Sequence, residues 1–142
     1  MSDILIKENI LTHCKSEPKE EIVKKLGEML NKSGYTTPAY TEAMLQKEKV
    51  FNTHIGFGLA IPHGVEGSNA EVIKSGIAIM TFPQGIQWGD QGTVKLVVGI
   101  AGKGDEHMDI LSNIAMNCSS EEAVEAIAEA DVDSIYSLFT GK

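Results

Sequence analysis

The sequence lacks paired cysteines, long apolar runs and any sign of a leader segment. Its two cysteines, Cys14 and Cys118, form no CxxC pair, which excludes a disulfide framework and a paired-cysteine zinc site and indicates a reduced protein. The longest apolar runs, near residues 77–82 and 96–101, are far shorter than a membrane-spanning helix, which needs about 20 residues. No apolar stretch of the signal-peptide type begins the chain. We therefore expect a cytoplasmic protein with no direct membrane insertion.

Positive charge is also scarce. The chain has 12 lysines and arginines against 20 aspartates and glutamates, which gives a formal net charge of −8. No basic stripe is available to meet the phosphates of a nucleic acid or the head groups of an anionic membrane. We expect no nucleic-acid binding, whereas an acidic surface favours basic protein partners.

The chain has 142 residues, the usual length of one domain, and we expect a single domain over residues 1–142. Apolar residues recur at helical spacing after Pro18, after Pro38 and from Asp105 onward. Apolar runs typical of strands lie between these segments, and the run at residues 94–101 is continuous enough to be covered on both faces. The pattern predicts an α/β domain with helices on both faces of a mixed sheet.

Three details of this prediction concern boundaries. Residues 83–85, with the sequence Pro-Gln-Gly, should break the strand that begins near residue 75. Ser119 precedes Glu122 by three residues, which predicts a capping box at the start of a helix. Residues 4–6 and 10–11 are candidates for short strands.

The most informative stretch reads GFGLAIPHG at residues 56–64. A short buried strand should end at Pro62, because proline has no N–H to give to a ladder, and His63 should then follow on a turn that points away from the core. A neutral imidazole has one bare nitrogen, which is a competent nucleophile toward phosphorus. The backbone N–H groups of Gly56, Gly58 and Gly64 could approach phosphate oxygens. Taken alone, His63 could equally be an ordinary histidine in a surface turn.

His107 is the second candidate. It follows the most buried strand at its carboxyl end, where open α/β sheets bind ligands, and falls in the first turn of a helix, whose free N–H groups attract anions. The alternative is a solvent-facing histidine. A metal could in principle be held by His63, His107, Glu106 and Asp109, but no HExxH or paired-cysteine spacing is present, so we expect neither a metal nor another cofactor.

Together these features resemble one family. The segment AMLQKEK at residues 43–49 precedes the GFGLAIPHG motif, and SGIA at 75–78, VKLVVGIA at 94–101 and Glu106-His107 follow it. Their order and spacing are similar to the enzyme IIA component of the bacterial sugar phosphotransferase system, mannitol/fructose class, over roughly residues 3–140. Residues 94–115 are most similar to the stand-alone mannitol-type members.

The resemblance implies a mixed, mostly parallel five-stranded sheet with helices on both faces. It implies a phosphotransferase in which His63 accepts a phosphoryl group from the phosphohistidine of HPr and passes it to a cysteine of the enzyme IIB component, for uptake of mannitol or a related sugar. His107 would stabilise the phosphoryl group, and Lys47 and Gly64 would bind phosphate. A backbone carbonyl would hold the δ nitrogen of His63 and leave the ε nitrogen to attack.

Several alternatives stay open from the sequence. The family commonly has an arginine where this chain has Lys47, and lysine keeps the charge without the bidentate fork. Relatives of this fold also act as regulatory modules that bind protein partners according to phosphorylation state, and a metal-dependent hydrolase is a weaker alternative. The sugar and the oligomeric state are not specified. We expect partners to dock on an apolar patch that includes Phe57, Ile61 and Val65.

Overall fold

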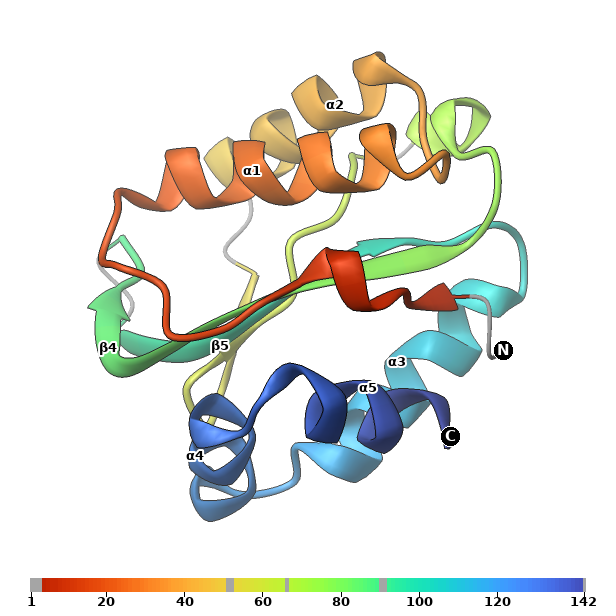
Figure 1. Cartoon of the computed structure of the whole chain (residues 1–142). Coiled ribbons are helices and arrows are strands. Elements are labelled where there is room, and N and C mark those ends of the chain that lie inside the picture. Colours follow the sequence, from red (N-terminus) through yellow and green to blue (C-terminus); the bar gives the residue numbers. More distant parts are fainter. Residues whose placement is uncertain (1–3, 51–52, 66, 90–91, 142) are drawn as a thin grey trace.

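The computed structural model describes residues 4–50, 53–65, 67–89 and 92–141. The chain forms three layers, with a twisted sheet between two groups of helices (Figure 1). Helices α1 (Lys19–Lys32) and α2 (Pro38–Val50) cover one face, and α3 (Glu106–Asn117), α4 (Glu121–Glu129) and α5 (Val132–Thr140) cover the other. The expectation of helices on both sheet faces is confirmed. In the part of the chain that the structure describes, no helix is long and apolar enough to cross a membrane.

The sheet has five strands in the order β1-β4-β5-β3-β2. Their bounds are β1 (Ile10–Leu11), β2 (His54–Gly56), β3 (Leu59–Ala60), β4 (Gly76–Gln87) and β5 (Thr93–Ala101). The pairs β1–β4 and β3–β5 are parallel, whereas β4–β5 and β2–β3 are antiparallel. The sheet is therefore mixed, as expected, but it is not mostly parallel. Its longest pairing is the antiparallel β4–β5 hairpin, because a loop too short for a crossover helix joins these strands.

Two boundary predictions were wrong. Residues 83–85 do not end a strand, because β4 runs on to Gln87 and a register shift between Thr81 and Ile86 accommodates the proline and glycine as a bulge. Helix α4 is capped by Ser120, not Ser119: the Ser120 side chain accepts a hydrogen bond from the backbone N–H of Ala123, 3.1 Å away. Of the two candidate strands near the N-terminus, residues 10–11 form β1 and residues 4–6 form no strand.

Side chains that alternate along the central strands feed two separate cores. Ile77 and Ile79 of β4 point to the layer of α3, α4 and α5, while Ala78 and Met80 point to the layer of α1 and α2. The same alternation in β5 explains why its sequence is apolar almost throughout, since both of its faces are covered. Helix α1 supplies one stripe to this second core at helical spacing, consisting of Ile22, Val23, Leu26 and Leu30.

The parallel pair β3–β5 determines where functional groups can gather. Leu59 pairs with Leu96 and Ala60 with Val97, so both strands end at the same edge of the sheet. The chain leaves β3 through Pro62 and His63, and it leaves β5 through Gly102 toward α3. Segments far apart in the sequence therefore meet at this edge.

Candidate functional site

His63 continues the register of β3 beyond the proline. It forms an isolated parallel bridge with Ile100 of β5, in which the backbone N–H of Ile100 donates to the carbonyl of Pro62 at 2.9 Å. Proline costs the ladder nothing here, because only its carbonyl is used on the β5 side. The turn is thus fixed to β5, the most buried strand of the sheet, while the His63 side chain lies at the edge.

The orientation of the His63 ring is also fixed. Nδ1 lies 2.8 Å from the carbonyl oxygen of Ile61, and since a carbonyl can only accept, Nδ1 carries the proton and donates it to this bond. In the neutral ring Nε2 is then the bare nitrogen, and the side chain is only partly buried. This is the arrangement expected from the resemblance, with one ring nitrogen held by the backbone and the other left as a nucleophile.

The ring of His107 lies beside it. The two ring centroids are 6.0 Å apart and the ring planes meet at 63°. His107 is in the first turn of α3, and this close approach depends on Gly102: a Cβ there would come within 2.5 Å of the His107 Cβ and 2.7 Å of its Cα. The two histidines predicted from the sequence are therefore brought together.

Burial lowers the pKa of His107 below its ordinary value of 6.5, and the charge of His63 lowers it further. Below about pH 6.5 the unfolded chain binds a proton that the folded chain resists, so this group makes stability fall as pH falls toward the folded-state value. We expect urea unfolding midpoints of the wild type to drop more steeply between pH 7 and pH 5 than those of His107→Gln. A His13→Asn control, at an exposed histidine outside the site, should keep the wild-type slope. Identical slopes in all three proteins would contradict this assignment.

A pocket of about 410 Å³ surrounds the two rings. All four residues predicted to serve the site line it: His63, His107, Lys47 and Gly64. Lys47 reaches the pocket from α2, which covers the opposite face of the sheet from α3. Gly56, by contrast, ends β2 and Gly58 lies in the turn that leads into β3, at the end of β3 away from His63, so they are not available to a phosphate on His63.

The backbone N–H of Gly64 is already engaged: it donates to the hydroxyl of Tyr40 at 3.0 Å. Tyr40 lies in α2, where its spacing is that of the buried apolar residues of the helix. The signal that could have singled it out is general, because a buried tyrosine hydroxyl usually finds a hydrogen-bond partner. Tyr40 is therefore a hydrogen-bonding residue of the pocket that sequence reasoning missed.

The acidic residues next to His107 have a different use. Glu106 accepts a hydrogen bond from the hydroxyl of Ser75 at 2.7 Å, and that hydroxyl accepts one from the backbone N–H of Lys103 at 2.8 Å. The chain is thereby fixed where it leaves β5 for α3. Among the residues that the structure describes, no three His, Cys, Asp or Glu side chains gather as a metal-ligand set.

The apolar docking patch was predicted partly wrongly. Val65 lines the pocket, but Ile61 is buried in the core between the sheet and helices α3, α4 and α5. Phe57 is half-exposed in the β2–β3 turn and lines a different hollow, beside Lys95 and Glu125. The reason is the direction of β3, which separates residue 57 from residue 63 by the length of the strand.

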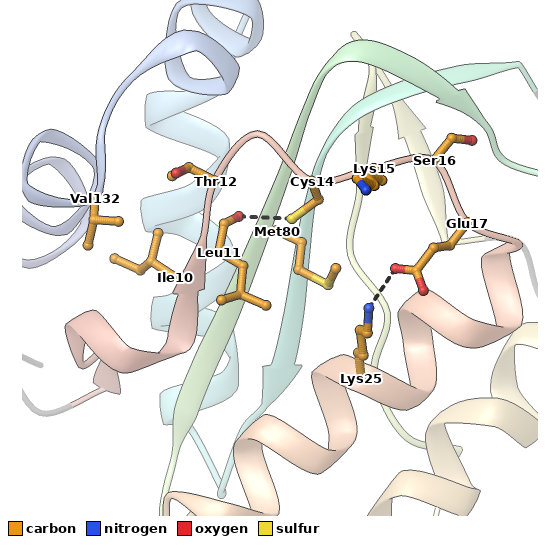
Figure 2. Close-up of a pocket in the computed structure, with 10 residues that line it drawn as sticks. All are labelled: Ile10, Leu11, Thr12, Cys14, Lys15, Ser16, Glu17, Lys25, Met80 and Val132. Atoms are coloured by element: carbon orange, nitrogen blue, oxygen red, sulfur yellow. Dashed lines mark hydrogen bonds and ion pairs between the residues drawn. The ribbon is translucent and has the colours of Figure 1, made fainter.

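A larger hollow, of about 640 Å³, lies at the β1 edge of the sheet (Figure 2). Three of its polar side chains are engaged with neighbours: Lys25 pairs with Glu17 at 2.8 Å, and the Cys14 thiol donates to the carbonyl of Leu11 at 3.4 Å. Burial raises the pKa of this thiol, which disfavours the nucleophilic thiolate. We therefore assign the functional site to the smaller pocket around His63 and His107.

Comparison with known proteins gives a consistent result. The family model described as phosphoenolpyruvate-dependent sugar phosphotransferase system, EIIA 2, matches residues 3–142. The mannitol-specific phosphotransferase enzyme IIA component of Bacillus subtilis (strain 168) is 45% identical over 127 residues, which cover 89% of this chain and 89% of that protein.

Two solved structures from Escherichia coli agree with this. The crystal structure of IIA mannitol is 33% identical, with a TM-score of 0.85, and the match covers 95% of this chain and 98% of that one. The complex of enzyme IIAMTL with phosphorylated enzyme IIBMTL matches with 33% identity and a TM-score of 0.88, covering 97% of this chain and 98% of that one.

Proposed function

Because this chain belongs to the EIIA 2 family of the phosphoenolpyruvate-dependent sugar phosphotransferase system, we propose that it carries a phosphoryl group on His63 between two protein partners. The observation that carries the proposal is the state of the His63 ring. Its Nδ1 is held by the Ile61 carbonyl, its Nε2 is bare, and a second imidazole lies 6.0 Å away between ring centroids.

In the first step the donor is the phosphohistidine of HPr. The lone pair of His63 Nε2 forms a new N–P bond while the N–P bond of the donor breaks, and its electron pair returns to the donor imidazole. In the second step a cysteine thiolate of the IIB component forms an S–P bond as the bond to Nε2 breaks. Neither step needs a metal or a nucleotide, since positioning and charge stabilisation are what phosphoryl transfer asks of the protein.

His107 and Lys47 provide that stabilisation. The pKa of His107 is lowered, so its ring is neutral near pH 7 and can donate one hydrogen bond to a phosphoryl oxygen without placing a second positive charge beside His63. Lys47 supplies the positive charge from the other side of the pocket. The chain contains no arginine, so a lysine point charge takes the place that a guanidinium fork has in other members.

The relatives suggest the physiological setting. The protein from Bacillus subtilis is described as mannitol-specific, and the matched complex joins IIAMTL with phosphorylated IIBMTL. For this chain we propose HPr as donor, a mannitol-type IIB component as acceptor and the cytoplasm as the location.

Reconstitution of the relay tests the function. Purified protein is incubated with radiolabelled phosphoenolpyruvate, enzyme I and HPr, then with a IIB component, and the acid-labile phosphate is mapped on the four histidines. We expect label on His63 alone, dependent on HPr, and its transfer to the IIB cysteine. Label that reaches His63 but never leaves for IIB would support the regulatory alternative, and absence of label on His63 would refute the carrier role.

A further inference from the structure

Tyr40 connects three separate parts of the site. It projects from the first turn of α2 and is only 4% exposed. Its hydroxyl donates to the backbone carbonyl of Ile100 at 2.9 Å and accepts from the backbone N–H of Gly64 at 3.0 Å. Since a phenol has one proton to donate, the hydroxyl gives this proton to the Ile100 carbonyl and can only accept from the Gly64 N–H. Helix α2, strand β5 and the turn that carries His63 are joined through a single oxygen atom.

The position of that oxygen is specific. In a parallel ladder, a residue bonds through its N–H to one neighbour on the partner strand and through its C=O to the residue two further on. Ile100 makes the first of these bonds directly, to the carbonyl of Pro62. The second would join the Ile100 carbonyl to the Gly64 N–H. Here the Tyr40 hydroxyl bonds to both groups, donating to the carbonyl and accepting from the N–H. The Tyr40 hydroxyl thus ties the Gly64 side of His63 to β5, while the Ile100 N–H holds the Pro62 side.

The tyrosine ring supports the same turn. A Cβ on Gly64 would lie 2.6 Å from Tyr40 Cε1 and would also collide with the hydroxyl oxygen of Ser68, so the turn rests directly on the ring. The next residue, Val65, donates its backbone N–H to the carbonyl of Ala43 at 3.3 Å. Residues 40, 43 and 47 follow helical spacing on one face of α2. One helix face thus holds the turn and brings Lys47 to the pocket.

We propose that Tyr40 is a positioning residue for phosphoryl transfer, whose hydroxyl fixes the turn so that His63 Nε2 faces the incoming phosphorus. The proposal rests on the carrier function proposed above. Tyr40 does not exchange protons during the reaction: burial raises the pKa of its phenol, which keeps the hydroxyl protonated and both of its hydrogen bonds in place.

Tyr40→Phe tests this, because it removes the oxygen and keeps the ring. We expect the rate constant for phosphoryl uptake from phosphorylated HPr at saturation to fall by about 10- to 100-fold, as misplacement of a reacting atom does, with KM for HPr unchanged. Tyr136→Phe is the matched control, since Tyr136 lies in α5 on the other face of the sheet and should transfer at the wild-type rate. Site-specific 3-fluorotyrosine at position 40 keeps the hydroxyl and should retain the wild-type rate.

A second readout needs no phosphorylation and separates this proposal from the carrier function. In the unphosphorylated protein, amide hydrogen exchange at Gly64 should be faster in Tyr40→Phe than in the wild type, and the NMR signals of the His63 ring nitrogens should shift. If Tyr40→Phe shows these changes but the wild type takes up no label, the carrier function is refuted, whereas the effect of Tyr40 on the turn still stands. A wild-type uptake rate in Tyr40→Phe, or a change confined to KM, would overturn the positioning role. So would a rate loss in the folded variant without any change at Gly64 or His63.

Discussion

Replacing His63 with alanine should abolish phosphoryl uptake from phosphorylated HPr. The change removes the nucleophile itself, and loss of a nucleophile that forms the covalent intermediate costs at least about 10⁴-fold in rate. The fold should persist, because the ring is partly exposed and its hydrogen bond inside the protein is a local one, to the carbonyl of Ile61. Rapid-quench labelling with radioactive phosphoenolpyruvate, enzyme I and HPr measures the rate, and circular dichroism checks the fold.

His107→Ala is the informative comparison for this experiment. It leaves the nucleophile in place and removes a neighbour whose proposed part is to stabilise the phosphoryl oxygens, so uptake should become slower and label should still appear on His63. A His63→Ala protein that took up label at the rate of His107→Ala would show that another group accepts the phosphate. Loss of folded structure in His107→Ala would instead show that His107 serves packing.

The closeness of the two histidines could be predicted from the sequence. Each follows an apolar run that ends in a turn residue, Pro62 in one case and Gly102 in the other. If the two runs are parallel neighbours, their carboxyl ends meet, and the structure pairs β3 with β5 in this way. The periodicity of α1 and the apolar sequence of β5 likewise predicted which elements enclose the core.

Other features depend on contacts across the fold, which a sequence does not contain. Tyr40 has the same apolar spacing as its neighbours in α2, and only the register of β3 against β5 places Ile100 and Gly64 at its hydroxyl. The end of one strand was misjudged for a related reason. Residues 83–85 were expected to end a strand, whereas a bulge in β4 absorbs them and produces a long antiparallel pairing.

Gly102→Ala should impair the site as strongly as loss of His107 does. Gly102 does not need its conformational freedom; it needs space, because an added Cβ would come within 2.7 Å of the His107 Cα. A backbone atom cannot rotate away, so the first turn of α3 must move and take the His107 ring with it. We expect phosphoryl uptake to fall by about 10- to 100-fold and the free energy of unfolding to fall by about 1–3 kcal/mol. Rapid-quench labelling and urea denaturation measure the two effects.

Gly34→Ala separates the two effects. Gly34 follows α1 with a φ of +88° and has no atom within 4 Å of an added Cβ, so alanine there strains the backbone without a collision. Its stability should fall by a similar order while its uptake rate stays that of the wild type. If Gly102→Ala transferred phosphate as fast as Gly34→Ala, the closeness of the two rings would not matter to the reaction, and His107 would lose its proposed part in it. If Gly102→Ala is slow and Gly34→Ala is not, the rate depends on where α3 begins, which ties the chemistry at His63 to the space left by one missing side chain.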